Sequence, residues 1–211
     1  QCAVKADGLA LGKGVLICNN TDEAIGAIDQ IMTDRAFGEA GSSVLIQELI
    51  TGMEVSLHAL CDGKTARLFP SSQDHKRALD GDQGLNTGGM GTYSPVPFLS
   101  DEKLNEMANA VLEPWLAGCA AEGIDFRGML YPGIMLTDDG PKVLEFNARF
   151  GDPETQVYLP RLENDLLDLF EASIDGTLDQ HELRWSDQSA VCVVIASGGY
   201  PGSYEKGKVI T

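Results

Sequence analysis

The sequence predicts an α+β chain in which antiparallel strands are joined by tight turns and accompanied by amphipathic helices. Apolar strand segments flank the turn signals Asp62-Gly63 and Asp138-Asp139-Gly140, a pattern typical of β-hairpins. Apolar residues recur at helical spacing in residues 25–32 and 104–119, which indicates helices with one buried face each. A chain of 211 residues can bury a core as one large domain or as two small ones.

The composition limits the partners that the protein can have. The chain carries 15 basic and 32 acidic side chains, a formal net charge of −17, so we expect it to bind neither nucleic acid nor an anionic membrane surface. No apolar run approaches the length of a membrane span, and we expect no signal peptide before the first strand. Five scattered cysteines without C-x-x-C spacing are typical of buried thiols in a reducing compartment, which predicts a cytoplasmic protein.

The N-terminal segment predicts two strands joined by a glycine-rich loop. The first strand contains Val4, and the second is Val15–Cys18. Glycines in such a loop let backbone N–H groups approach phosphate oxygens, and Lys5 and Lys13 supply positive charge. The segment lacks the Gly-Lys-Ser/Thr of a P-loop, and a hairpin with a mobile tip explains the same residues equally well.

A helix and a third strand follow this loop. Asn20 or Thr21 is expected to cap the helix, and Ile25 and Ile31 are expected on its core face. The next apolar segment, Ser43–Leu49, predicts a strand.

The strands Glu54–Cys61 and Thr65–Phe69 are expected to form the hairpin around Asp62-Gly63. His58 lies within the first of them. Because no His or Cys lies at metal-binding spacing from it, we expect His58 to have a structural role.

Residues 70–98 form the longest segment without a regular pattern, and a loop of this length is usually either functional or disordered. His75, Lys76 and Arg77 bring three basic side chains together in an otherwise acidic chain. Asn86–Gly91 offers backbone N–H groups for an anion. The alternative is a mobile solvated loop, and we expect the least order at residues 78–85.

Three further elements complete the chain. Ser100 is expected to cap a long helix, and Met129–Thr137, interrupted at Pro132-Gly133, is expected to pair with Lys142–Asn147. A last helix is expected to start at Asn164 or Asp165, followed by the apolar strand Ser189–Ala196.

The strand at residues 142–147 carries the strongest chemical signal. Its apolar residues, including Phe146, indicate a buried strand. Residues two apart in a strand share a face, so Glu145 and Asn147 are expected to point the same way, and Arg149 joins them if the strand continues that far. Two oxygen donors beside a guanidinium can hold a magnesium ion and the phosphates that it bridges. A solvated ion pair between Glu145 and Arg149 is the plainer alternative.

Gly-Asp-Pro-Glu follows directly at residues 151–154 and favours neither a strand nor a helix start. We therefore expect a fixed turn that holds Asp152 and Glu154 beside the face of Glu145.

Several of these segments closely resemble one known family. The run Glu-Phe-Asn-x-Arg-Phe-Gly-Asp-Pro-Glu at residues 145–154 resembles the signature of the glycinamide ribonucleotide synthetases (phosphoribosylamine–glycine ligases), which are ATP-grasp enzymes. Ser-Gln-Asp-His-Lys-Arg, Asn-Thr-Gly-Gly-Met-Gly and the N-terminal glycine loop are similar to further motifs of this family, in the family's order. The resemblance extends from Val4 to about Gly202.

The resemblance implies an ATP-grasp fold with two α+β subdomains that clamp ATP. The implied domains are a small lid at residues 1–55, a larger subdomain with metal and catalytic residues at 56–188, and the start of a truncated C-terminal domain at 189–211. The implied reaction joins glycine to 5-phosphoribosylamine with ATP cleavage, in de novo purine synthesis, and uses Mg²⁺ or Mn²⁺. A monomer is expected.

The resemblance also implies roles for individual residues. The implied metal ligands are Glu145 and Asn147, and the implied catalytic residues are Arg149, Asp152 and Glu154. The implied ATP-binding residues are Lys5, Gly12, Lys13, Gly14, Gln47, Glu48, Ile50 and Glu54. The implied substrate-binding residues are Asp74, Lys76, Arg77, Gly88 and Gly89.

The sequence departs from the family pattern in places. Gln47 stands where the family usually has an acid, whereas Gly133, at a position where many ATP-grasp proteins have a metal-binding acid, is the residue usual in this ligase family. The family's N-terminal domain and most of its C-terminal domain have no counterpart in this sequence, so we expect the isolated chain to be inactive. Another ATP-grasp carboxylate–amine ligase of purine synthesis, or a nucleotide-binding fragment without turnover, are the alternatives.

Overall fold

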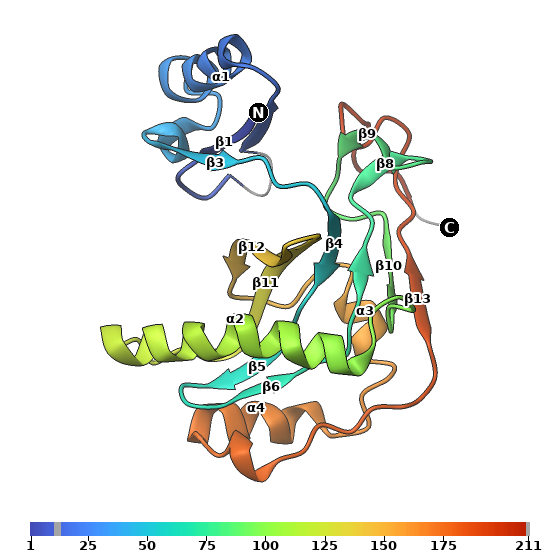
Figure 1. Ribbon diagram of the computed structural model, residues 1–211. Coiled ribbons are helices and arrows are strands. Elements are labelled where there is room, and N and C mark those ends of the chain that lie inside the picture. The colour runs from blue at the N-terminus through green and yellow to red at the C-terminus, as the bar shows by residue number, and fades with distance from the viewer. Residues whose placement is uncertain (11–13, 210–211) are drawn as a thin grey trace. The chain divides into compact units, whose positions relative to one another are not determined.

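The computed structural model describes residues 1–10 and 14–209, which belong to two compact units, Gln1–Thr51 and Gly52–Thr211 (Figure 1). Both units mix strands and helices, which confirms the predicted α+β class. None of the helices in the described part of the chain is long and apolar enough to cross a membrane. The five cysteines are free thiols.

The first unit is a three-stranded antiparallel sheet with a helix packed on one face. The strands lie in the order β2 (Val15–Cys18), β1 (Cys2–Ala6) and β3 (Val44–Glu48). The helix α1 (Thr21–Ile28) runs on into a π-helical turn at Asp29–Thr33, and a short 3₁₀ helix, Gly38–Gly41, precedes β3.

Asn20 caps the start of α1, as the sequence predicts, and Glu23 binds the residue before the cap. Asn20 Oδ1 accepts a hydrogen bond from the Glu23 N–H at 2.9 Å, and Glu23 Oε2 accepts one from the Asn19 N–H at 2.9 Å. Ala27 and Ile31 are the buried residues of this segment, whereas Ile25 is 54 % exposed. The predicted core position of Ile25 is therefore wrong, because the buried stripe follows Ala27 and Ile31 at four-residue spacing.

The second unit is built on a five-stranded antiparallel sheet. Four strands lie in the order β12 (Gly140–Asn147), β11 (Arg127–Thr137), β5 (Ala59–Asp62) and β6 (Ala66–Leu68). The fifth, β4 (Met53–Ser56), pairs with the C-terminal half of β11, while β5 pairs with its N-terminal half.

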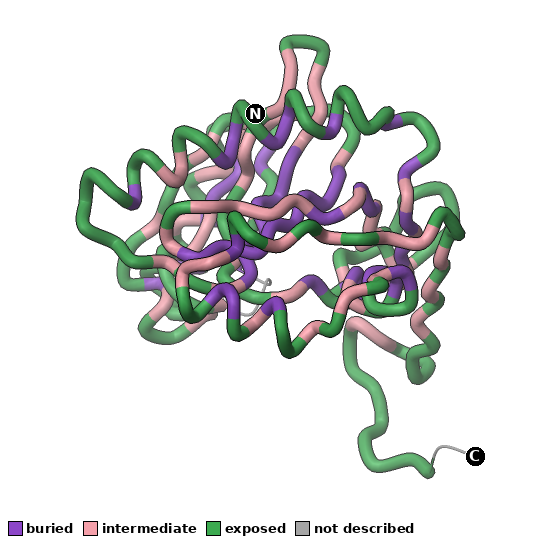
Figure 2. The backbone as a smooth tube through the Cα atoms, turned by 90° about the horizontal axis from the view of Figure 1, so that it is seen from below, coloured by how far each residue is buried: buried purple, intermediate pink, exposed green. Residues whose placement is uncertain are grey.

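Helices cover both faces of this sheet (Figure 1). α2 (Asp101–Glu122) lies on one face and α4 (Leu166–Asp175) on the other. The alternation of a strand explains both cores, since Ala59 and Cys61 pack with α2 whereas Leu60 packs with α4. All four residues of β5 are buried, whereas the tail at residues 203–209 is exposed throughout, as the green tail in Figure 2 shows.

Both ends of α2 carry the expected signals. Ser100 Oγ accepts a hydrogen bond from the Lys103 N–H at 3.3 Å, which confirms the predicted N-cap. Gly123 ends the helix with a left-handed φ of 68°, a conformation that costs glycine little.

The predicted interruption of a strand at Pro132-Gly133 is wrong for β11 itself, which runs unbroken from Arg127 to Thr137. The interruption instead affects one of its neighbours. β5 ends its pairing at Leu130 and β4 begins at Gly133, so Leu57 and His58 join the two strands at this point.

Residues 70–98 are not irregular, which corrects the prediction for this segment. They contain β7 (Gln73–Asp74), β8 (Arg77–Leu79), β9 (Gln83–Asn86) and β10 (Gly91–Ser94). β8 and β9 form a hairpin whose turn has positive φ at Gly81 and Asp82. β10 lies between β7 and the distant strand β13 (Ala190–Val193), a pairing that local sequence cannot reveal.

Candidate functional site

Glu145 and Asn147 lie on one face at the end of β12, as strand alternation predicts, whereas Arg149 lies two residues beyond the strand and adjoins Asn147. Asn147 Nδ2 donates a hydrogen bond to Glu145 Oε1 at 3.3 Å. Arg149 Nη2 donates a longer one to Asn147 Oδ1 at 3.5 Å, and its guanidinium lies 5.8 Å from the centre of the Tyr131 ring. Glu145 and Arg149 are exposed, so a ligand can reach both charges.

A β-bulge shapes this end of β12. Gly133 pairs with Glu145 and Ile134 pairs with Val143, so β12 has one more residue than β11 at this point. Phe146 stays 48 % exposed at the end of the strand, and the prediction that it is buried is wrong. A Cβ atom at Gly133 would lie 3.6 Å from Glu145 Cγ. An acid at Gly133 would thus sit against Glu145, and this chain has none there.

Glu154 is 1 % exposed and follows the turn that begins at Gly151. Its Oε1 accepts hydrogen bonds from Tyr131 Oη at 2.6 Å and from Ser56 Oγ at 2.7 Å. A buried carboxylate is costly unless such donors satisfy it, so the two hydroxyl groups fix its position. Asp152, two residues earlier, is exposed and accepts a hydrogen bond from Gln156 Nε2 at 2.9 Å.

A buried histidine adjoins this carboxylate. His58 is 0 % exposed, and its Nε2 accepts a hydrogen bond from the Gly151 N–H at 3.1 Å. Its Nδ1 lies 3.0 Å from Tyr158 Oη, which is 2.6 Å from Ser72 Oγ. The expectation that His58 is structural agrees with these contacts.

Asp74 lies close to the same turn. A Cβ atom at Gly89 would lie 2.7 Å from Asp74 Oδ1 and 2.4 Å from Pro153 Cδ, so only glycine allows this approach. Asp74 Oδ1 is buried and has no hydrogen-bond partner among the described residues. Burial and the neighbouring Glu154 carboxylate raise the pKa of Asp74 to about 7, although Lys76 opposes this shift.

Lys76 forms an ion pair with Glu54. Burial alone would lower the pKa of Lys76, but the Glu54 carboxylate and the nearby acids Asp74 and Glu145 raise it above its ordinary value. The structure therefore brings Asp74, Lys76 and Gly89 into one polar region with Glu154.

Two predicted substrate residues contact other parts of the chain. Arg77 Nη1 donates to the Gly84 carbonyl at 2.8 Å within the β8–β9 hairpin. The Gly88 N–H donates to Tyr200 Oη at 3.0 Å, a contact across 112 residues.

The predicted ATP residues of the first unit lie on or beside its sheet. Lys5 of β1 pairs with Val15 and Leu45, which are 39 % and 54 % exposed. On β3, Gln47 and Glu48 pair with Ala3 and Cys2. Gly14 and Ile50 adjoin β2 and β3 in the chain, whereas Gly12 and Lys13 lie outside the described residues.

The oxygen donors at Glu145 and Asn147 suit a hard divalent cation. Among the described residues no cluster of three or more His, Cys, Asp or Glu side chains could hold a metal. Because Asn147 Nδ2 now donates to Glu145, its amide must turn before Oδ1 can share a cation with that carboxylate.

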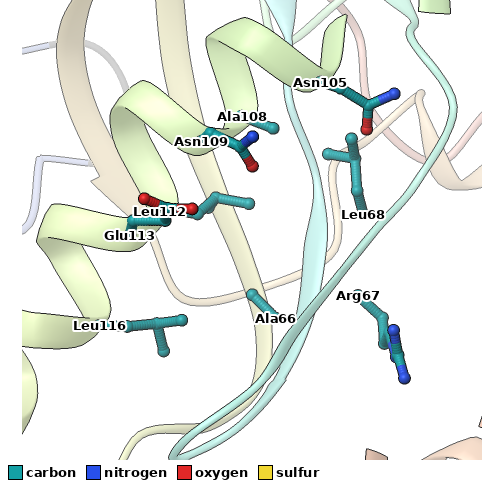
Figure 3. A pocket seen from close by; sticks show the side chains of 9 residues that line it. All are labelled: Ala66, Arg67, Leu68, Asn105, Ala108, Asn109, Leu112, Glu113 and Leu116. Carbon is teal, nitrogen blue, oxygen red and sulfur yellow. The ribbon is translucent and has the colours of Figure 1, made fainter. Parts of the chain in front are cut away.

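A groove of about 330 Å³ lies apart from these residues, between β6 and α2 (Figure 3). Ala66, Leu68 and Leu112 line it, and Glu113 is its one acid. The guanidinium of Arg67 on its rim is hydrogen-bonded to the carbonyls of Leu178 and Asp179, at 2.9 and 2.7 Å. The groove therefore offers neither a free cationic group nor an acidic cluster.

The sequence did not identify Ser56, Tyr131, Ser72 and Tyr158 as part of the polar region around Glu154 and His58. The one signal is that Ser56 and Tyr131 are polar residues within largely apolar strands, at positions that are buried, whereas Ser72 and Tyr158 lie outside the strands. Buried polar side chains require partners, and such positions point to a polar network.

Known proteins resemble this chain over most of its length. The model of the phosphoribosylglycinamide synthetase ATP-grasp (A) domain matches residues 1–155. The chain is 52 % identical over 208 residues to a phosphoribosylamine–glycine ligase of Halalkalibacterium halodurans, covering 99 % of this chain and 48 % of that protein. It is 52 % identical over 209 residues to the trifunctional purine biosynthetic protein adenosine-3 of Gallus gallus, covering 99 % of this chain and 21 % of that protein.

Solved structures are similar in fold. A crystal structure of a phosphoribosylamine–glycine ligase from Thermotoga maritima has a TM-score of 0.81 and 37 % identity, covering 98 % of this chain and 52 % of that one. The biotin carboxylase domain of the Hydrogenobacter thermophilus 2-oxoglutarate carboxylase has a TM-score of 0.66 at 16 % identity, over 90 % of this chain and 40 % of that one, and shows the fold alone. The chain spans about half the length of the phosphoribosylamine–glycine ligases that it matches. With its ATP-grasp (A) domain matched over residues 1–155, this chain belongs to the phosphoribosylglycinamide synthetase family.

Proposed function

We propose that the protein carrying this chain joins glycine to 5-phosphoribosylamine, giving glycinamide ribonucleotide, ADP and phosphate in de novo purine synthesis. The family match and the names of the relatives support this assignment. In the proposed reaction the glycine carboxylate attacks the γ-phosphate of ATP and forms glycyl phosphate. The amine then attacks the acyl carbon and phosphate leaves. Such a reaction needs placement and charge neutralisation more than a protein nucleophile.

The observation that carries this proposal is the cluster of Glu145, Asn147 and Arg149 at the end of β12. We assign Glu145 and the turned Asn147 amide to Mg²⁺ or Mn²⁺, which when bound would offset the negative charge of the ATP phosphates. Arg149 would neutralise the charge that develops as the γ-phosphate is transferred, since its guanidinium adjoins Asn147.

The ATP-binding assignments in the first unit rest on charge and exposed apolar surface. Lys5 lies on β1 between the exposed apolar residues Val15 and Leu45, a suitable surface for a flat base beside a phosphate-binding charge. The remaining assigned residues are the phosphate loop of Gly12, Lys13 and Gly14, the adenine-binding residues Gln47, Glu48 and Ile50, and Glu54 for the ribose.

We assign Glu154 and Asp152 to the ammonium group of glycine, because both are acids on one turn that follows β12 in the chain. Asp74, Lys76, Arg77, Gly88 and Gly89 are assigned to phosphoribosylamine. Of these, Asp74 is the best supported, since its buried Oδ1 can accept a hydrogen bond from an amine. Arg77 would first have to release the Gly84 carbonyl.

We further propose a cytoplasmic monomer, with a lid at residues 1–55, a larger subdomain at 56–188 and the start of a further domain at 189–211. Five free thiols fit a reducing compartment.

The test is ADP release by the full-length protein that contains this chain. We expect release to require glycine and phosphoribosylamine together, and to fall when glycine is replaced by alanine or another carboxylate. Turnover with a different carboxylate and no response to glycine would assign the chain to another ligase. ATP binding without any turnover of the full-length protein would show a binding protein.

A further inference from the structure

His58 lies in the chain between β4 and β5, and its ring contacts other residues at both nitrogens and on one face. Its Nε2 accepts the Gly151 N–H at 3.1 Å, and its Nδ1 lies 3.0 Å from Tyr158 Oη. One ring face stacks on Tyr131, with centroids 4.0 Å apart and an interplanar angle of 18°. The side chain is 0 % exposed, and contacts within the protein occupy both ring nitrogens.

These contacts determine the tautomer of the ring. A backbone N–H can only donate, so Nε2 must be the unprotonated acceptor. The proton is therefore on Nδ1, which donates to Tyr158 Oη, and Tyr158 in turn donates to Ser72 Oγ at 2.6 Å. Burial, together with the Arg149 charge, lowers the pKa of His58 to about 3 and keeps the ring neutral.

Both backbone polar groups of Gly151, the N–H and the carbonyl, form hydrogen bonds. His58 Nε2 accepts a hydrogen bond from the Gly151 N–H. The Gly151 carbonyl oxygen accepts hydrogen bonds from Thr155 N at 3.1 Å and Thr155 Oγ1 at 2.5 Å. A Cβ atom at residue 151 would lie 2.7 Å from His58 Nε2 and 2.6 Å from Glu154 Oε2. The imidazole and the Glu154 carboxyl group thus both lie close to Gly151.

We propose that His58 is a positioning residue for the amino-acid substrate, because it fixes the Gly151–Glu154 segment through the Gly151 N–H and supports the Tyr131 hydroxyl that holds Glu154. The inference rests on the proposed function, in which Asp152 and Glu154 bind the ammonium group of glycine. It adds a residue that acts only through others.

The kinetic test uses the full-length protein. His58→Phe keeps an aromatic ring but removes the acceptor, and we expect the KM for glycine to rise at least tenfold while the KM for ATP changes less than twofold. His58→Gln can place an oxygen near the Nε2 position and should recover most of the loss. His181→Phe, at a histidine distant in sequence from this segment, is the control and should leave both constants unchanged.

Equal rises in both KM values, or a folded His58→Phe protein with an unchanged glycine KM, would overturn the proposal. If His58→Phe does not fold, Tyr158→Phe tests the proposal instead. It removes the hydroxyl group that accepts from His58 Nδ1 but keeps the histidine ring in place. We then expect a smaller rise confined to the glycine KM, and an unchanged glycine KM contradicts the proposal.

A second readout does not depend on the reaction. Nitrogen NMR of ¹⁵N-histidine-labelled protein should show His58 as the neutral Nδ1–H tautomer from pH 5 to pH 8. The Nε2–H tautomer or a protonated ring would overturn the positioning role. An Nδ1–H ring in a protein that never turns over glycine would instead contradict the proposed function alone.

Discussion

Tyr131 donates a hydrogen bond of 2.6 Å to Glu154 Oε1, and both residues are buried. Burial and the adjacent Glu154 carboxylate raise the pKa of Tyr131 above its ordinary value, so the hydroxyl group keeps its proton and remains a donor. This single bond links β11 of the central sheet to the turn that carries Asp152 and Glu154.

Removing that hydroxyl group should weaken the fold measurably. Tyr131→Phe keeps the ring against His58 but leaves Glu154 with one donor fewer, which is expected to cost about 1–3 kcal/mol. Urea unfolding measures the loss. Tyr204→Phe, at a ring that is 40 % exposed, is the matched control and should change stability by less than about 0.5 kcal/mol. Equal effects of the two substitutions would show that the bond to Glu154 contributes nothing.

Asp74 should make the protein less stable as the pH rises. Burial and the Glu154 carboxylate raise its pKa to about 7 in the folded state, with Glu54 acting in the same direction, while Lys76 and the His75 N–H oppose the shift. Between about pH 4 and pH 7 the unfolded chain has lost this proton and the folded chain retains it, so stability falls as pH rises.

Asp74→Asn removes this dependence. Between pH 5 and pH 8 the wild type should lose more free energy of unfolding than the variant. The expected difference is on the order of 1 kcal/mol, since solvent reaches part of the carboxyl group. Urea titrations at both pH values measure it, and parallel changes in the two proteins would mean that Asp74 ionises at its ordinary pKa.

The β8–β9 hairpin should open locally in the absence of substrate. It is a two-stranded hairpin, and its Leu79 and Leu85 side chains are each 65 % exposed, so little burial stabilises it. Limited proteolysis of the native chain should cleave first within residues 79–85. Full protection there without any ligand, while other surface loops are cut, would contradict this expectation.

The cap of α1 offers a test within the first unit. Asn20→Ala removes the acceptor for the Glu23 N–H and should destabilise the helix by about 1 kcal/mol, whereas Asn20→Asp keeps an acceptor. Hydrogen exchange of the α1 amides measures the difference, and identical exchange in the two variants would show that the cap has no effect.

Local pattern predicted those features that depend on neighbours in the chain. Strand alternation placed Glu145 and Asn147 on one face, and the capping residues Asn20 and Ser100 were found where expected. Ile25 and Phe146 were placed wrongly. Their exposure depends on which stripe of a helix packs and on a bulge in β12, and hydrophobicity alone reveals neither.

The centre of the site depends on contacts between distant residues. Glu154 meets Ser56 across 98 residues and Tyr131 across 23, and Gly151 meets His58 across 93. These contacts form where the break between β4 and β5 lies opposite β11, and no local sequence pattern encodes this break. The sequence therefore predicted the acids of the site but not the hydroxyl groups and the imidazole that hold them.

The most direct test of the central claim is calorimetric titration of this 211-residue chain with Mg–ATP. We expect saturable heat of binding that requires the divalent cation, and at least about tenfold weaker Mg-dependent binding for Glu145→Gln and Asn147→Ala, each a loss of about 1.4 kcal/mol or more. A coupled ADP assay on the same chain should show little or no product. The absence of binding heat from the folded chain, or Mg-dependent binding unchanged in both variants, would contradict the assignment of nucleotide and metal to these residues.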